Sequence, residues 1–314
     1  MASYLYGPVH SRRLGLSLGV DLLPPKTCTY DCLYCQIGRT ESPTMRRKLY
    51  SPPEEVVGEV KSYLAENPSP DYITLGGSGE PTLHSGFGDI ARDIKQISDV
   101  PICMISNGSL FHLSEVRDGC APLDVILPSL DAPDAETFRR INRPHRDITF
   151  RHVVEGLERL SQEFTGEIWL EILFLEGIND SEAHIGAFRR LIGRIDPDRV
   201  QLNTAVRPAA HPDTRAVSPE RLYEIQVELG PHAEVIASFP DEPRETTREV
   251  EKERILDMLR RRPCTLGDIS EGLGVNPHAV SKILGQLSER GKIETREKGD
   301  EVYYAPTASD VSTS

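Results

Sequence analysis

Short apolar segments alternate with longer amphipathic segments along most of the chain. Each short segment is apolar at nearly every position, which is typical of parallel strands that are buried on both faces. The strands expected from this pattern span residues 15–23, 72–75, 102–106, 125–130, 168–175 and 200–203.

In the longer segments, apolar residues recur every three or four positions, which predicts helices. Ser51, Ser181 and Ser218 stand just before three of these segments, where a serine hydroxyl can cap the first backbone N–H groups. The expected helices span residues 53–66, 87–97, 149–163, 182–195 and 219–229.

Six strand–helix repeats predict an α/β domain over residues 1–238, built as a partial parallel (β/α)6 barrel. The barrel is expected to be incomplete because a closed one has eight repeats and about 250 residues. A doubly wound open sheet has the same periodicity, so it remains an alternative.

A second, smaller domain is expected after a polar linker at 239–247, which contains two prolines. Helices are predicted at 249–261, 265–273 and 277–290, with Gly274 in a turn, followed by a hairpin of strands 292–295 and 301–304. This order predicts a winged helix-turn-helix domain over 248–306. Residues 307–314 are expected to form a flexible tail.

The composition favours a globular protein outside membranes. Of the 314 residues, 38% are hydrophobic and 27% are charged, and no apolar run approaches the roughly 20 residues that span a bilayer. The chain starts without a secretory leader, so we expect a cytoplasmic protein in a reducing compartment. Cysteines there are more often thiols or metal ligands than disulfides.

The net charge of −13 is unevenly distributed. Residues 246–309 hold 11 basic and 11 acidic side chains, whereas residues 1–245 hold 25 basic and 37 acidic ones. Because nucleic-acid affinity depends on clustered lysine and arginine, the large domain is expected to be a poor non-specific nucleic-acid binder.

Half of the six cysteines lie in one eight-residue segment after the first expected strand. Cys28, Cys32 and Cys35 form a C-x3-C-x2-C pattern in a loop at that strand's carboxyl end, where α/β barrels place their sites. Three thiolates on a short loop can bind three irons of a [4Fe–4S] cluster and leave the fourth iron open to a small molecule.

A structural zinc site with a fourth ligand such as His10 is the alternative, although zinc sites usually combine two ligand pairs. The other cysteines, Cys103, Cys120 and Cys264, are isolated in the sequence, so a single cluster is expected. Cys103 lies in an apolar run and is expected to be a small buried side chain.

A glycine-rich turn follows the second expected strand, with the sequence Gly-Gly-Ser-Gly-Glu-Pro at 76–81. It matches neither a dinucleotide fingerprint nor a P-loop. Its glycines allow a ligand close to the backbone, and Glu80 offers acceptors to an ammonium group. A tight turn with a solvated glutamate is the alternative.

Together, the cysteine loop, the glycine-rich turn and the Ile-Ser-Asn-Gly strand end at 105–108 resemble the radical S-adenosylmethionine (SAM) superfamily. Further segments resemble one branch of it, the iron–sulfur oxidoreductases related to wyosine-type tRNA-modification enzymes. These segments are 127–131, 141–145, 169–172, 177–180 and 201–204, and the resemblance covers about residues 5–235.

The resemblance implies that Cys28, Cys32 and Cys35 hold the cluster, whose fourth iron binds the amino and carboxylate groups of SAM. Tyr34 would pack near the adenine. Gly76, Gly77 and Glu80 match the motif that binds the methionine amino group, although two residues are inserted before the glutamate. The other implied SAM contacts are Ser106 and Asn107 for the ribose, and Ser129 and Asp131 for the methionine carboxylate or the ribose.

Other polar residues are weaker candidates. Glu171, the acid within an apolar strand, is expected either to contact SAM or substrate or to pair with an arginine. Asn203 and Gln201 alternate on the last strand and are candidates to face the ligand, with plain hydrogen-bonding roles as the alternative. Arg143 and His145 are candidate contacts for an anionic group.

Two basic runs are candidates for a rim that receives phosphate, namely 12–13 and 46–48, although most such runs are solvated. The expected recognition helix of the small domain carries His278, Ser281, Lys282, Gln286 and Arg290. Because that domain has no net charge, DNA contact and protein docking remain alternatives.

The sequence therefore predicts a radical SAM iron–sulfur enzyme that starts a 5′-deoxyadenosyl-radical reaction on an unidentified substrate. The branch resemblance suggests RNA as that substrate and a reductant such as ferredoxin or flavodoxin. The alternative function is a redox-sensing winged-helix regulator that binds DNA.

Overall fold

The computed structural model divides into two compact units, Met1–Phe239 and Pro240–Ser314, which are described separately. In the first unit it describes residues 3–11, 13–206, 209–212 and 214–237. In the second it describes residues 252, 255–256, 258–260, 263–273, 280, 283–285, 287–288, 290–298 and 301–307.

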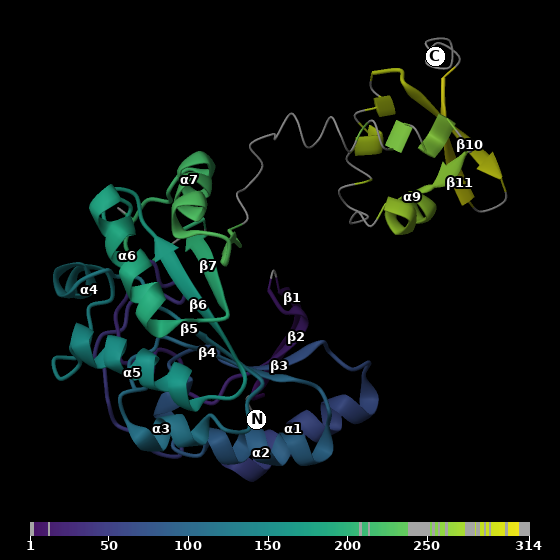
Figure 1. The fold of residues 1–314 in the computed structure, drawn as a ribbon. Coiled ribbons are helices and arrows are strands. Elements are labelled where there is room, and N and C mark those ends of the chain that lie inside the picture. Colours follow the sequence, from purple (N-terminus) through teal and green to yellow (C-terminus); the bar gives the residue numbers. More distant parts are fainter. Residues whose placement is uncertain are drawn as a thin grey trace. The chain divides into compact units, whose positions relative to one another are not determined.

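An eight-stranded sheet forms the centre of the first unit (Figure 1). Its strands follow one another in chain order; the first pair is antiparallel and every later pair is parallel. The strands are β1 (Leu5–Ser11), β2 (Gly15–Val20), β3 (Tyr72–Leu75), β4 (Ile102–Ser106), β5 (Val125–Pro128), β6 (Glu167–Phe174), β7 (Arg199–Thr204) and β8 (Ala233–Val235).

This order decides between the two architectures expected from the sequence. A doubly wound sheet reverses its strand order at one point, whereas a barrel-type sheet winds in one direction. The observed order contains no reversal, which confirms an α/β fold of the partial-barrel kind. The outer strands β1 and β8 extend the six expected strands to eight.

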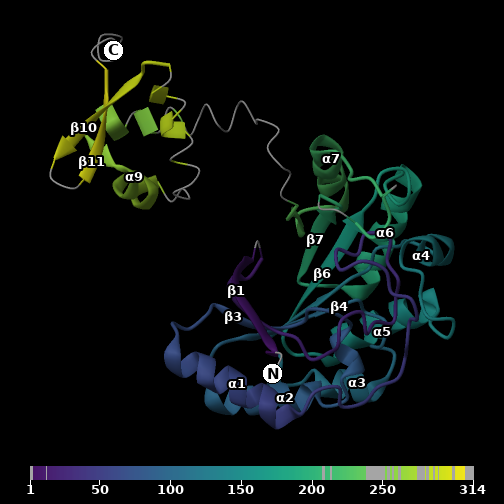
Figure 2. The same cartoon turned by 180° about the vertical axis from the view of Figure 1, so that it is seen from behind.

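Helices line the outer side of the curved sheet (Figures 1 and 2). Ser181 and Ser218 cap two of them as expected, but the Ser51 hydroxyl instead donates to the carbonyl of Leu22 at 3.2 Å. The helices are α1 (Pro53–Glu66), α2 (Phe87–Ile97), α3 (Ser114–Gly119), α4 (Ala135–Ile141), α5 (Phe150–Glu163), α6 (Glu182–Ile195) and α7 (Pro219–Leu229), with a 3-10 turn η1 at Pro81–Leu83.

The inner face of the sheet changes character along the strands. Near the amino ends it is filled by the apolar side chains of Leu14, Cys103, Val125, Leu127 and Trp169. Because side chains alternate between faces, Glu171 and Leu173 share the inner face with Trp169. The inner surface therefore becomes polar toward the carboxyl ends of β6 and β7, where Glu171 and Asn203 lie.

The second unit has a hydrophobic core of its own, which includes Ile255, Leu259, Ile269 and Val280. Its three-stranded sheet has the order β10-β11-β9 and contains the expected hairpin. The elements are β9 (Cys264–Thr265), α9 (Leu266–Leu273), β10 (Ile293–Lys298) and β11 (Glu301–Pro306).

The winged-helix assignment stays a prediction, because the expected turn at Gly274 lies outside the described residues. So do His278, Ser281, Lys282 and Gln286 of the expected recognition helix. Across the described part of the chain, the structure contains no helix that is long and apolar enough to cross a membrane.

Candidate metal and cofactor site

The cysteine loop follows β2 and is fixed by the segment that follows α4. The Leu33 N–H donates to the carbonyl of Ile141 at 2.9 Å, and the His145 N–H donates to the carbonyl of Thr29 at 2.8 Å. These backbone hydrogen bonds join residues more than 100 positions apart and hold the loop at the carboxyl ends of the strands.

Each of the three cysteine sulfurs has a nitrogen donor beside it. Asn107 Nδ2 lies 3.5 Å from Cys28 Sγ, and Asn142 Nδ2 lies 3.5 Å from Cys32 Sγ. Lys26 Nζ lies 3.2 Å from Cys35 Sγ. Neither Lys26 nor Asn142 was singled out from the sequence, although Lys26 stands two positions before the first cysteine.

The three cysteines are free thiols and partly exposed, whereas Cys103, Cys120 and Cys264 are buried elsewhere. No group of three cysteine, histidine or acidic side chains within the described residues is arranged to bind a single metal ion. Zinc needs its ligands about 2–2.3 Å from one point, whereas in a cubane each thiolate binds a different iron. Three thiols on one loop match the donor set of a [4Fe–4S] cluster, in which each would bind a different iron.

Burial raises the pKa of the Cys28 thiol to about 11 and that of the Cys32 thiol well above its usual value. Iron binds the thiolate, so metal binding must displace a proton from each sulfur. The neighbouring N–H donors then stabilise the thiolate charge.

Glu80 lies at the start of η1, directly after the glycine-rich turn, and is 1% exposed. Its Oε1 accepts from Thr82 N at 3.1 Å and from Ser106 Oγ at 2.8 Å, and its Oε2 accepts from Asn107 N at 2.7 Å. Burial raises the pKa of this carboxyl group. The glutamate therefore joins the ends of β3 and β4, and the second lone pair of Oε2 remains able to accept from a ligand.

Two glycines of the turn are required by close contacts. A Cβ atom on Gly77, whose φ is +152°, would lie 2.6 Å from Asp21 Cγ. A Cβ atom on Gly79 would lie 2.1 Å from the carbonyl oxygen of Thr27. The Ser78–Gly79 insertion thus lets the turn pack against the segment leading into the cysteine loop. The third glycine of the turn, Gly76, contacts β1, because its carbonyl accepts a hydrogen bond from Tyr6 Oη at 3.1 Å.

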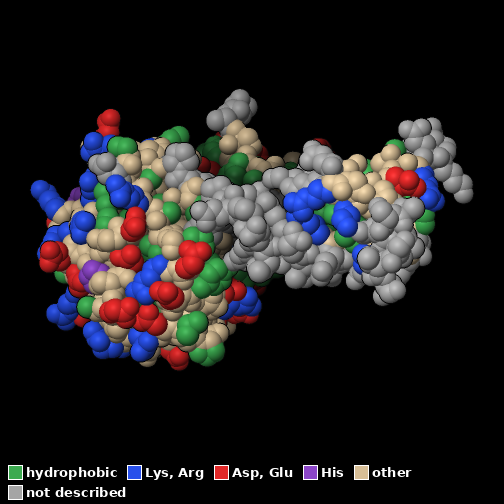
Figure 3. Space-filling view, turned by 90° about the horizontal axis from the view of Figure 1, so that it is seen from above, with side chains coloured by type: hydrophobic (Ala, Val, Ile, Leu, Met, Phe, Trp, Pro, Cys, Tyr) green, Lys and Arg blue, Asp and Glu red, His purple; other side chains and the backbone are tan. Residues whose placement is uncertain are grey.

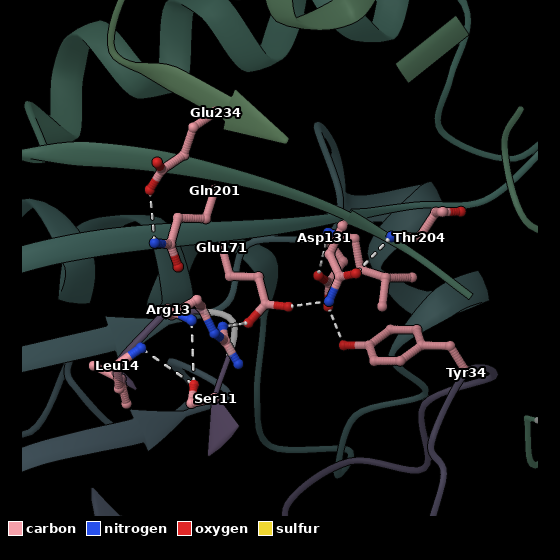
Figure 4. Close-up of polar contacts among 11 residues, drawn as sticks. Ser11, Arg13, Leu14, Tyr34, Asp131, Glu171, Gln201, Thr204 and Glu234 are labelled. Carbon is pink, nitrogen blue, oxygen red and sulfur yellow. Dashed lines mark hydrogen bonds and ion pairs between the residues drawn. The ribbon is translucent and has the colours of Figure 1, made fainter. Parts of the chain in front are cut away.

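Asp131, expected as a SAM contact, joins three elements and is 3% exposed. Its carboxylate accepts from Tyr34 Oη (Figure 4). It also accepts from Asn142 Nδ2 at 2.8 Å and from Leu173 N at 3.1 Å. Burial raises the pKa of Asp131 to about 6. The hydrogen bonds that its carboxylate accepts lower the pKa, but burial has the larger effect. Ser129, also expected, is half-buried and pairs with Glu171 through the backbone.

Glu171 forms an ion pair with Arg13 on the inner face of the sheet (Figure 4). Its other oxygen accepts from Asn203 Nδ2 at 2.8 Å. Arg13 belongs to the basic run 12–13, a candidate for a phosphate-receiving rim. Its guanidinium pairs with Glu171 instead, which is the arginine ion pair expected as the alternative for this acid.

Gln201 neighbours this pair and is 1% exposed. Its amide nitrogen donates to Glu234 Oε1 at 2.9 Å (Figure 4), while its Oε1 has no hydrogen-bond partner among the residues that the structure describes. The inner wall of β6–β8 thus carries Glu171, Gln201, Asn203 and Glu234, a polar surface beside the apolar cluster.

The other expected anion contacts are engaged within the protein. Arg143 contacts His211 and lies 3.5 Å from Asp31 Oδ2, and His145 lies 3.6 Å from Asp147. Of the basic run 46–48, Arg47 donates to the carbonyl of Thr82 at 2.9 Å. Figure 3 shows basic and acidic side chains interspersed over the visible face of the first unit.

Residues 22–187 match the family model described as the radical SAM superfamily. A UPF0026 protein of Methanocaldococcus jannaschii is 33% identical over 235 residues, 74% of this chain and 71% of that protein. A Brachyspira hyodysenteriae protein named GTPase Obg is 37% identical over 292 residues, 92% of this chain; the chain spans 43% of that relative's length.

The crystal structure of a radical SAM methyltransferase from Sphaerobacter thermophilus is similar in fold. Its TM-score is 0.55 at 19% identity, and the match covers 71% of this chain and 66% of that one. Within the superfamily, the relative from M. jannaschii places the chain among the UPF0026 proteins. The chain belongs to the radical SAM superfamily, and it is an enzyme that uses a [4Fe–4S] cluster and SAM.

Proposed function

We propose that this enzyme cleaves SAM reductively at a [4Fe–4S] cluster held by Cys28, Cys32 and Cys35, and so starts a 5′-deoxyadenosyl-radical reaction. The observation that carries the proposal is the convergence of three thiols and the carboxylates of Glu80 and Asp131 at the carboxyl ends of β2–β5. The cluster, when bound, supplies one electron to the sulfonium group of SAM.

The chain's own residues would position SAM around that cluster. Glu80 Oε2 can accept from the methionine amino group, since among the described residues it accepts one hydrogen bond, from Asn107 N. Ser106 and Asn107 hold Glu80 in place from the end of β4 and lie where we propose the ribose. Tyr34 and Asp131, which are hydrogen-bonded to each other, would lie beside the adenosine.

The inner face of the sheet would shape the space for the substrate. Its apolar cluster excludes water from one side, and a radical reaction needs competing hydrogen donors kept away. We propose Glu171 and Asn203 as contacts to SAM or substrate on the polar side, with Arg13 balancing the glutamate's charge.

Cleavage is tested on the full chain purified without oxygen, reconstituted with iron and sulfide, and reduced with dithionite. We expect 5′-deoxyadenosine and methionine in equal amounts, and their loss in Cys32→Ser. Cys103→Ser is the matched control, because Cys103 is buried in the apolar cluster, and it should retain cleavage. An intact cluster that releases no 5′-deoxyadenosine would contradict the proposal.

RNA is the substrate class we propose, and its support is the resemblance to the wyosine-type branch. The experiment incubates the reduced enzyme with SAM and unfractionated tRNA and then analyses the nucleosides by mass spectrometry. A new nucleoside mass that depends on SAM supports RNA modification, and unchanged masses with ongoing SAM cleavage would reject it. The alternative function, a redox-sensing DNA-binding regulator, receives no support from the relatives.

A further inference from the structure

The three cysteine sulfurs share one feature that the cluster itself does not require, namely a side-chain N–H donor beside each. The donors come from three places in the fold: Asn107 from the end of β4, Asn142 from the end of α4, and Lys26 from the loop after β2. Two are neutral amides, and the third carries a full positive charge.

The backbone of the loop holds Lys26 in one unusual conformation. Its φ is 63°, in the left-handed region that non-glycine residues seldom adopt. The Lys26 N–H donates to the carbonyl of Ser78 at 2.7 Å, and Pro24 and Pro25 precede it and restrict the chain. A strained backbone is maintained only where its surroundings determine it, and such residues cluster at functional sites.

The charge of Lys26 is directed at the sulfur rather than at an acid. Its Nζ donates to the carbonyl of Gly38 and lies 3.2 Å from Cys35 Sγ. Among the residues that the structure describes, Lys26 forms no ion pair with a carboxylate. Its field is therefore not cancelled by a neighbouring negative charge at contact distance.

A cation and N–H donors beside cluster sulfurs stabilise the state with more negative charge, which is the reduced one. We propose that Lys26, assisted by Asn107 and Asn142, is a positioning residue that raises the reduction potential of the bound cluster. A higher potential lets the electron donor reduce the cluster more readily. This inference rests on the proposed cluster at the three cysteines and adds to it the residue that sets its potential.

The test is a redox titration of the reconstituted full chain, with the reduced cluster followed by electron paramagnetic resonance. Lys26→Met removes the charge and the donor, whereas Lys26→Arg keeps both. At a fixed solution potential, we expect the ratio of reduced to oxidised cluster to fall about tenfold in Lys26→Met, which is 59 mV for one electron. Lys26→Arg should remain close to the wild type, and Lys26→Gln should lie between.

Iron and sulfide analysis separates the possible failures. Wild-type protein that takes up no iron and sulfide would overturn the proposed function, and this inference with it. Equal midpoint potentials in wild type, Lys26→Met and Lys26→Arg, at equal iron content, would overturn this inference alone. If both neutral variants lose the cluster and Lys26→Arg keeps it, Lys26 acts in holding the cluster, and its assigned role in the potential is wrong.

Discussion

At the scale of single residues, the ion pair of Arg13 and Glu171 joins positions 158 residues apart across the inner face of the sheet. The two side chains are 16% and 11% exposed, so water screens their charges little. Asn203 adds a hydrogen bond to the same carboxylate. Breaking such a pair from one side leaves a poorly solvated charge without its partner.

We therefore expect Arg13→Met to destabilise the first unit by about 3 kcal/mol. Glu171→Gln keeps the acceptor for Asn203, but Arg13 then loses its counter-charge. We therefore expect it to lower the free energy of unfolding by a similar amount. The double variant should cost much less than the sum of the two single ones. Denaturant unfolding followed by the fluorescence of Trp169, the chain's one tryptophan, measures the first unit. If the destabilisation of the double variant equals the sum of the two single ones, Arg13 and Glu171 are not energetically coupled.

His84 gives the first unit a dependence on pH. It is fully buried, its Nδ1 accepts from Gly86 N at 3.2 Å, and its Nε2 lies 3.0 Å from the carbonyl of Ser51, an arrangement that suits the neutral ring. Burial lowers its pKa below the usual 6.5. The unfolded chain therefore takes up this proton first as the pH falls.

The free energy of unfolding should consequently decrease as the pH falls below about 6.5, until the folded-state pKa is reached. The wild type and His84→Asn are compared by denaturant unfolding between pH 7.5 and pH 5. We expect the stability advantage of the wild type to shrink over this range. An advantage that stays constant or grows toward pH 5 would contradict the neutral, buried histidine.

At the scale of elements, two helix glycines have opposite surroundings. A Cβ atom on Gly88 of α2 would lie 2.5 Å from the carbonyl oxygen of Gly119 in α3, whereas one on Gly193 of α6 would meet nothing within 4 Å. Alanine is the better helix former by about 1 kcal/mol, so only local space decides the sign of the effect.

We expect Gly88→Ala to destabilise the first unit by about 1–3 kcal/mol, because α2 and α3 must move apart. Gly193→Ala, its matched control, should leave stability unchanged or raise it by up to about 1 kcal/mol. Thermal and denaturant unfolding of both variants measures this. Equal effects at the two positions would contradict the close packing of α2 on α3.

Elements with strong periodicity could be predicted from the sequence almost to the residue, as α1, α2, α6 and α7 were. Three kinds of element could not. β1 contains Gly7–Pro8, which argues against a strand, yet Pro is tolerated at a sheet edge. β8 has three residues, and α3 and α4 have six and seven, too few to show a period.

The site followed the same division. The cysteine loop and Glu80 were identifiable because their chemistry lies within a few adjacent residues. The partners Arg13, Lys26 and Asn142 were not, because their roles depend on contacts that only the folded backbone creates. Arg13, for example, contacts Glu171, which lies 158 positions away in the sequence. Burial also changed expectations: Arg13 and Arg47 carry surface-type side chains but are engaged inside the protein.

At the scale of the whole molecule, each hydrophobic cluster of the described residues belongs to one unit. Four clusters lie within the first unit and one within the second. All of the candidate cluster and SAM contacts lie in the first unit. Since cooperativity depends on a shared core, we expect the full chain to unfold in two calorimetric transitions.

A chain of residues 1–239 should reproduce one of these transitions with its midpoint unchanged, and Trp169 fluorescence should assign that transition to the first unit. The same fragment should bind as much iron and sulfide as the full chain. A single cooperative transition of the full chain, or a fragment that does not fold, would contradict independent cores.

The central claim is that three cysteines hold a cubane whose fourth iron is open to SAM. The most direct measurement is electron–nuclear double resonance on the reduced, reconstituted full chain with SAM that carries ¹⁵N in its amino group and ¹⁷O in its carboxylate. The account predicts hyperfine coupling of both labels to the cluster signal. A cluster signal with no coupling to either label, or a protein that binds zinc in place of iron and sulfide, would contradict it.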